Sequence, residues 1–262
     1  MRHRNPLIVI LWFLAFGLWA QMAMAIETFP VNITPAQVEL GTFYGGAKVH
    51  VNGTVVSGSN VIVIVRGASG AEVFNKLGRV GPIWVNTGKV TISGAPTLLL
   101  VFSSAALETC LNPDWLGRYG LDQASLKQNM QIKTQVADRG RIADDFLALK
   151  AKQGTYRTAS GSVRLGSPEQ DHVPYSLDFN LPRSASPGRY LVTAIECRNG
   201  GVAKNTDVDL AVVEVGFPAL VSRLAREHAP LYGAIAVVIA MMAGFGIDFI
   251  ASRVFKRKVA AH

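Results

Sequence analysis

Cysteine is scarce in this chain of 262 residues, which contains only Cys110 and Cys197. Neither belongs to a Cys-x-x-Cys or Cys-x-x-Cys-His motif, so the usual redox and c-type haem signatures are excluded. Both residues lie in the stretch predicted below to be exported, and an oxidising compartment favours a disulfide there. We therefore predict a Cys110–Cys197 bond, with two unpaired buried thiols as the alternative.

Sequence motifs of the common catalytic classes are also missing. The chain has no Gly-x-Ser-x-Gly nucleophile elbow, no His-Glu-x-x-His zinc motif and no P-loop. Its five histidines are scattered, and Asp171-His172 is too small a set for a metal site, which needs three or four ligands. We predict no catalytic, cofactor-binding or metal site, and hence a protein that is not an enzyme.

Acidic residues are fewer than basic ones, 18 against 26, and the net charge is +8. Such a balance can indicate nucleic-acid binding, but six of the basic residues lie at the two ends of the chain: Arg2, Arg4, Arg253, Lys256, Arg257 and Lys258. The part between them has no basic cluster with interleaved aromatic residues. We therefore exclude nucleic acid as a partner.

One long uncharged run lies near the end of the chain. Residues 229–247 carry no charge, and the length of this run is close to the ~20 residues needed to cross a bilayer. Basic residues follow at once, and such residues collect on the cytoplasmic side. We predict a juxtamembrane stalk over 218–229, a transmembrane helix over 230–252 and a basic cytoplasmic tail over 253–262. A buried helix of a soluble protein is the alternative.

Small residues recur along this predicted span. Ala236, Ala240 and Gly244 are four residues apart, and Asp248 continues the series. Such a stripe lets another helix approach closely, and the same helix would shield the acid from lipid. We predict an interface with a transporter helix or with a second copy of this chain. The alternative is that small residues are simply common in spans and that Asp248 reaches interfacial water.

The start of the chain is typical of a secretory signal peptide. Arg2 and Arg4 precede an apolar core, and Ala23-Met24-Ala25 fits a cleavage site. We predict a signal peptide over residues 1–25, cleaved after Ala25, with an uncleaved anchor as the alternative. The chain is then a single-pass protein of the inner (plasma) membrane, with its N-terminal domain in the periplasm.

Residues 26–104 alternate short β-type segments with turns that contain glycine. The run Val61-Ile62-Val63-Ile64-Val65 is apolar at every position, as expected for a central strand buried on both faces. Further strands are predicted at 37–40, 47–56, 72–80, 83–85, 89–93 and 97–103. Six or seven strands at this spacing predict a mainly β fold, an immunoglobulin-like β-sandwich without the Cys-Trp-Cys signature.

A helical insert is predicted over residues 105–153. Residues 121–135 are compatible with a helix, and Arg141 to Lys152 is the strongest candidate, because Ile142, Phe146 and Leu149 share one face. Gly154 lies just past its end, where glycine is favoured.

Strands resume in a second β region over residues 154–217. Residues 186–190, Ser-Pro-Gly-Arg-Tyr, resemble the tyrosine corner of β-sandwiches, and Asn199-Gly200-Gly201 is typical of a hairpin turn. The sequence leaves open whether this region completes the first sandwich or forms a second one.

Residues 81–86, Gly-Pro-Ile-Trp-Val-Asn, are the most distinctive external stretch. A packed tryptophan beside a turn is the favoured interpretation, because tryptophan is costly to leave exposed. The functional alternative is a recognition edge that includes Trp84 and Asn86.

This stretch, the strand that ends Val63-Ile64-Val65-Arg66-Gly67, and the turn at 186–190 together resemble a family of alphaproteobacterial transmembrane proteins. The resemblance implies a shared plan of signal, external β-rich part, one C-terminal span and basic tail. It implies no particular activity. Family members often stand beside a gene for a sulfite-exporter-like permease, which implies such a permease as a partner. Members more usually have Gly-Pro where this chain has Gly67-Ala68, so a role tied to that proline does not transfer.

Together these observations predict a non-enzymatic accessory or binding subunit of a membrane transporter, one that exports sulfur oxyanions. Two alternatives remain open. A periplasmic hydrolase or metal-dependent enzyme would need polar residues that only the fold brings together. An envelope-assembly or adhesion module would be favoured by a long exposed β edge.

Overall fold

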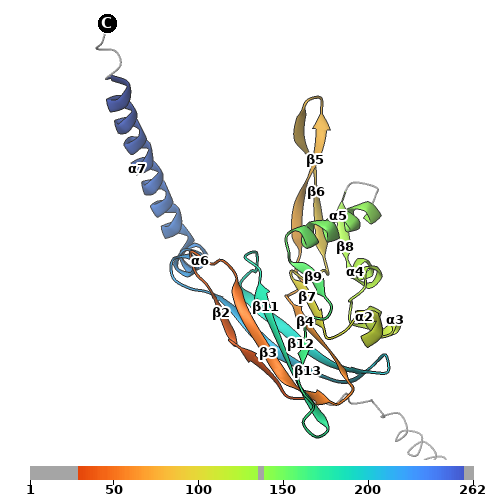
Figure 1. Ribbon diagram of the computed structural model, residues 1–262. Helices are drawn as coiled ribbons and strands as arrows, with labels where there is room; N and C mark the ends of the chain where they lie inside the picture. Colours follow the sequence, from red (N-terminus) through yellow and green to blue (C-terminus); the bar gives the residue numbers. More distant parts are fainter. Residues whose placement is uncertain (1–28, 135–138, 257–262) are drawn as a thin grey trace, which may run out of the picture.

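The computed structural model describes residues 29–134 and 139–256. Its body is mainly β-structure: two sheets form the centre, a long hairpin stands away from them, and a final helix leaves the body (Figure 1). The predicted signal peptide over residues 1–25 lies outside the described residues. So do residues 257–262 of the predicted basic tail.

Two sheets make up the body. The smaller has four antiparallel strands in the order β1 (Val31–Thr34), β3 (Ala47–Val56), β11 (His172–Leu181) and β10 (Arg164–Leu165). The larger has six strands in the order β2 (Gln37–Leu40), β13 (Gly201–Glu214), β12 (Gly188–Arg198), β4 (Asn60–Arg66), β7 (Leu99–Ser103) and β9 (Tyr156–Ala159).

The main hydrophobic core lies between these sheets. Val51 of β3 and Leu177 of β11 belong to the same buried cluster as Val63 of β4 and Val192 of β12. Burying a side chain of this kind stabilises the fold by about 1.5–3 kcal/mol. Residues 61–65 of β4 are all fully buried, which confirms the predicted central strand.

The two β regions of the sequence form a single sandwich. β11 pairs with β3 over ten residues, and β12 inserts between β13 and β4. Strands from 154–217 therefore complete the sheets begun by strands from 26–104, which decides between the two alternatives left open above.

Two turn predictions are confirmed. The Tyr190 hydroxyl donates to the Ser186 carbonyl oxygen at 2.8 Å and accepts from the Ser186 amide at 3.0 Å, which is the hydrogen bonding expected of a tyrosine corner. Asn199 and Gly200 both have positive φ, 53° and 73°, and join β12 to β13 as a two-residue hairpin turn requires.

The predicted helical insert contains four helices: α2 (Leu107–Cys110), α3 (Pro113–Arg118), α4 (Gln123–Asn129) and α5 (Arg139–Lys152). Side chains cap two of them, because Asn112 accepts from the Trp115 amide and Asp122 from the Ser125 amide. Leu107 and Leu111 pack with Ile64 of β4 and Ile195 of β12 in a second cluster. The insert thus covers the face of the larger sheet that points away from the main core.

The prediction of a helix over residues 121–135 is wrong in its second half. The helix ends at Asn129, and β8 (Gln131–Thr134) follows as a strand that pairs with Val90 to Ser93. Pairing with an available strand edge outweighs the helix compatibility of this short polar segment. The strong prediction, α5, is confirmed, and Gly154 lies past its end with a positive φ of 70°.

Residues 72–93 are strands, as predicted, but they do not join the sandwich, which corrects the prediction that they belong to it. They form one long hairpin, β5 (Glu72–Val80) and β6 (Ile83–Ser93), which among the described residues pairs only with β8 in a three-stranded sheet. β4 and β7 on either side of this segment pair directly, Arg66 with Leu99. The hairpin is therefore an excursion between two neighbouring strands, and it projects from the body in Figure 1.

The described part of the chain ends in two helices, α6 (Phe217–Glu227) and α7 (Ala229–Lys256). Residues Ala229–Arg253 of α7 are long and apolar enough to cross a membrane, and their most apolar 18-residue stretch has a mean hydropathy of 2.2 and is not buried by the body. The structure therefore supports the span predicted over 230–252 and not the buried-helix alternative. The predicted stalk over 218–229 is α6, an amphipathic helix.

Candidate functional site

The projecting hairpin is built around a tight turn at its tip. β5 and β6 pair from Glu72–Ile92 at the base to Val80–Ile83 at the tip, and Gly81 takes a positive φ of 60° in the two-residue turn. The Arg79 side chain donates from Nε to the Gly81 carbonyl oxygen at 3.1 Å, which braces this turn. An irregularity in register between Lys76 and Leu77 shifts the pairing by one residue.

Trp84 lies beside this tip and is 68% exposed. The favoured interpretation from the sequence, a packed tryptophan, is therefore wrong. Packing was expected because tryptophan gains most from burial, but among the described residues the two strands have no other strand beside them at the tip. Asn86 is also exposed, and its side chain accepts a hydrogen bond from the Gly88 amide at 3.0 Å. A recognition role for this edge stays a prediction.

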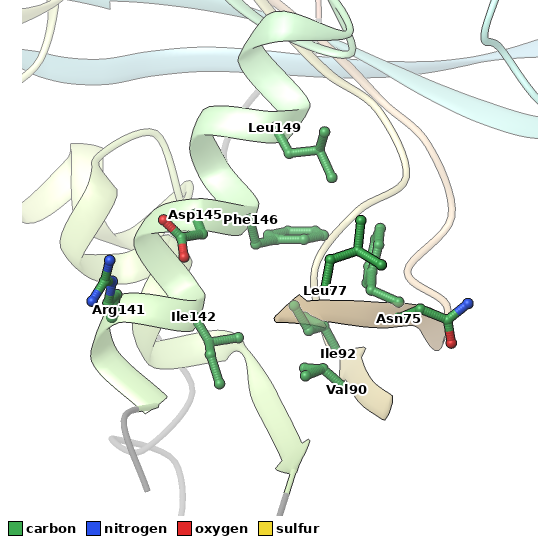
Figure 2. Close-up of a pocket in the computed structure, with 10 residues that line it drawn as sticks. Asn75, Leu77, Val90, Ile92, Arg141, Ile142, Asp145, Phe146 and Leu149 are labelled. Carbon is green, nitrogen blue, oxygen red and sulfur yellow. The ribbon is translucent and has the colours of Figure 1, made fainter. Parts of the chain in front are cut away.

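A groove opens between the hairpin and helix α5. Its volume is about 550 Å³, and Figure 2 shows Leu77, Val90 and Ile92 of the hairpin facing Phe146 and Ile142 of the helix. The rings of Phe74 and Phe146 also line the groove and meet edge to face, with their centroids 5.8 Å apart. The lining is largely apolar, with Asn75, Arg141 and Asp145 as its polar members. Such a groove can hold an apolar side chain and fix its direction at the rim.

One buried ion pair joins the hairpin to α5. Lys150 Nζ lies 2.5 Å from a Glu72 carboxylate oxygen and 5.3 Å above the Phe146 ring, and the lysine side chain is only 5% exposed. The Tyr156 hydroxyl donates to the Pro96 carbonyl oxygen at 2.6 Å close by, and burial raises the pKa of this tyrosine. These contacts fix the base of the hairpin, so the groove keeps its width there.

The two cysteines belong to the cluster under α2. Cys110 of α2 and Cys197 of β12 are both buried there, and the structure has no bond between their sulfur atoms. Burial raises the pKa of both thiols, and the neighbouring Cys110 and Glu196 raise the pKa of Cys197 further. The chain thus brings two residues that are distant in sequence into one cluster, and the disulfide stays a prediction.

Some polar contacts were not predicted from the sequence. His50 Nδ1 lies 2.9 Å from an Asp178 carboxylate oxygen on the outer face of the smaller sheet, and this hydrogen bond lowers the pKa of Asp178. Glu196 is buried and accepts from Ser59 at 2.7 Å and from Arg198 at 2.9 Å. The alternation of side chains along the strand predicted that His50 faces water. Its partner Asp178 could not be predicted, because it depends on the register in which β3 pairs with β11. Among residues 29–134 and 139–256, no three potential metal ligands come together.

The predicted membrane stripe lies on one continuous helix. Ala236, Ala240, Gly244 and Asp248 all belong to α7, where a spacing of four residues puts them on one face. All four residues are exposed. The stripe is therefore available to another helix, and its role as an interface stays a prediction.

Comparison with known sequences now decides the family. A family described as "Putative transmembrane protein (Alph_Pro_TM)" matches residues 28–257, which includes the whole β body and α7. The chain belongs to this family. The resemblance found in residues 81–86, 63–67 and 186–190 is confirmed, and membership of this Alph_Pro_TM family agrees with the one candidate membrane helix among the described residues. No curated protein matches the chain.

Proposed function

We propose that this Alph_Pro_TM protein is a non-enzymatic accessory subunit of a membrane transporter, held in the inner membrane by α7 with its β body in the periplasm. The proposed partner is the sulfite-exporter-like permease that the family resemblance implies, and the transported class is sulfur oxyanions. The observation that carries the proposal is the groove between the hairpin and α5. An external segment of the permease would place an apolar side chain there, between Leu77 and Phe146.

The orientation of α7 supports the same arrangement. Arg253 and the basic residues after it follow the apolar segment, and basic flanks favour the cytoplasm. A reporter that is active only in the periplasm should therefore be silent when fused after His262. Activity of that reporter would place the body in the cytoplasm and contradict the proposal.

The groove can be tested with two variants matched in exposure. Leu77 lines the groove and is 60% exposed, whereas Val73 lies on the same strand outside it and is 62% exposed. Leu77→Asp should abolish co-purification of the permease from gently solubilised membranes, because a charge would enter an apolar contact. Val73→Asp should leave co-purification at the wild-type amount. Equal recovery with both variants would exclude the groove.

The stripe on α7 is tested separately. Replacing Ala240 and Gly244 together by leucine should weaken association in the membrane, because bulky side chains separate the helices. Differently tagged copies of the protein distinguish self-association from permease binding. If every membrane association survives this double change, the stripe is not an interface.

A second candidate function rests on the free edge of β5. This strand of nine residues pairs with β6 and, within the described residues, has no partner strand on its other side. Such an edge can accept a strand from another protein, as in envelope-assembly or adhesion modules. Strand addition would slow amide hydrogen exchange along β5 in a purified complex, whereas groove binding would protect α5 instead.

A further inference from the structure

The tip of the hairpin exposes apolar side chains on both of its faces. Val80 pairs with Ile83, and Arg79 pairs with Trp84, so consecutive positions place Ile83 on one face and Trp84 on the other. Val80 is 58% exposed, Ile83 59% and Trp84 68%. A flat protein partner would cover one face and leave the other in water. A medium that surrounds the tip covers both.

The tip lies on the membrane side of the molecule. In Figure 1 the hairpin and α7 project from the body in broadly the same direction, and the tip lies well past the level at which α7 begins, toward the level of its later turns. The hairpin is therefore on the side of the body that faces the membrane, and a tilt of α7 within the usual range of about 0–40° brings the tip to the surface of the facing leaflet.

The charge and residue types of the hairpin fit a bilayer surface. Between residues 73 and 93 the sequence contains Lys76, Arg79 and Lys89 but no aspartate or glutamate. Basic residues are attracted to anionic lipid headgroups, and tryptophan is enriched where headgroups meet acyl chains. No other strand in the described part of the chain pairs with the outer backbone edges of the tip, so these edges need water and cannot lie in the hydrocarbon core.

We propose that residues 80–84 insert into the headgroup region of the leaflet that faces the β body and form a second membrane contact beside α7. Trp84 and Ile83 contact the upper acyl chains, while Arg79 stays at the phosphate level. This contact fixes the rotation of the body about α7. It does not require the permease, so it holds or fails independently of the proposed function.

Fluorescence of the full-length protein tests the insertion. The purified chain is reconstituted in liposomes of phosphatidylcholine and phosphatidylglycerol, and the spectrum of Trp84→Phe is subtracted to isolate emission from Trp84. Lipids with brominated acyl chains should remove most of this emission, and aqueous iodide should remove little. The double variant Val80→Asp, Ile83→Asp should reverse both results, because two charges keep the tip in water. Val73→Asp, at the hairpin base, should behave as the wild type.

Two outcomes would overturn the proposal. Strong quenching by iodide without quenching by brominated chains would show that the wild-type tip remains in water. Protection from both quenchers in pure lipid would show that a second copy of the protein covers the tip.

Discussion

Two apolar β segments that follow each other in the chain have opposite surroundings. Residues 61–65 of β4 are at most 1% exposed, whereas Val73, Leu77 and Val80 of β5 are 58–62% exposed. β4 lies between β12 and β7 in the larger sheet. The main core covers one of its faces, and the second cluster, which contains Leu107 and Leu111, covers the other. β5 has one neighbouring strand within the described residues and is an edge.

The difference shows that apolar character alone does not bury a strand. Burial requires partners on both edges and both faces, and these come from distant parts of the chain. The apolar side chains of β4 contribute to stability. Those at the hairpin tip remain exposed and contribute little to the stability of the fold. Three experiments test this difference between the buried body and the exposed hairpin.

The largest effect is expected from the predicted Cys110–Cys197 disulfide. Closing a loop of this length stabilises the fold by ~4–5 kcal/mol in the chain-entropy model, less any strain. Because the bond would join α2 to β12, reduction should lower the free energy of unfolding of the body and leave protease cleavage of the hairpin unchanged. Denaturant unfolding with and without reductant measures this. Two free thiols in protein purified from the envelope without reductant would contradict the bond.

A matched pair of substitutions compares the two segments directly. Ile62→Ala removes methyl groups from a fully buried site in β4 and should cost about 2–5 kcal/mol of unfolding free energy. Ile83→Ala, at the exposed tip, should change it by less than about 0.5 kcal/mol in detergent. Denaturation of the solubilised full chain gives both values. Equal losses would mean that the tip is packed and that the contrast between the segments is false.

A smaller loss than that of Ile62→Ala is expected where the hairpin joins the body. Glu72→Ala leaves the buried Lys150 ammonium without its carboxylate and should cost ~1–3 kcal/mol, because Glu72 is itself partly exposed. The loss should appear as faster amide exchange in β5 and β6 and not in β4. Asp144→Ala breaks the exposed Lys127–Asp144 pair and serves as the control, with a change of ~0–1 kcal/mol. Faster exchange in β4 as well would mean that the hairpin and body unfold together.

Local patterns in the sequence predicted the elements whose signals are strong. Five consecutive apolar residues predicted β4, an uncharged run predicted α7, and the Tyr190 and Asn199 turns follow from side-chain and backbone preferences of single residues. These features depend on a few neighbouring positions, which the sequence contains completely.

Features that depend on distant partners were not predictable. The pairing of β12 with β4 joins residues more than a hundred positions apart, and the segment at 131–134 became a strand only because the edge of β6 is available. The groove has lining residues from β5, β6 and α5, and no local pattern links them. Tryptophan normally predicts burial, but the exposure of Trp84 depends on the lack of a neighbour at the tip, which is a property of the whole fold.

The strand order of the larger sheet has a consequence for how the chain folds during its synthesis. β2, β4 and β7 are made early, but β12 and β13, which join β4 to β2, are made last, just before α6 and α7. Until residue 214 has emerged, the early strands have unsatisfied edges and exposed apolar faces. The sandwich therefore closes at almost the moment when α7 is ready to enter the membrane. A chaperone that shields the first half of the chain until then would protect it from aggregation.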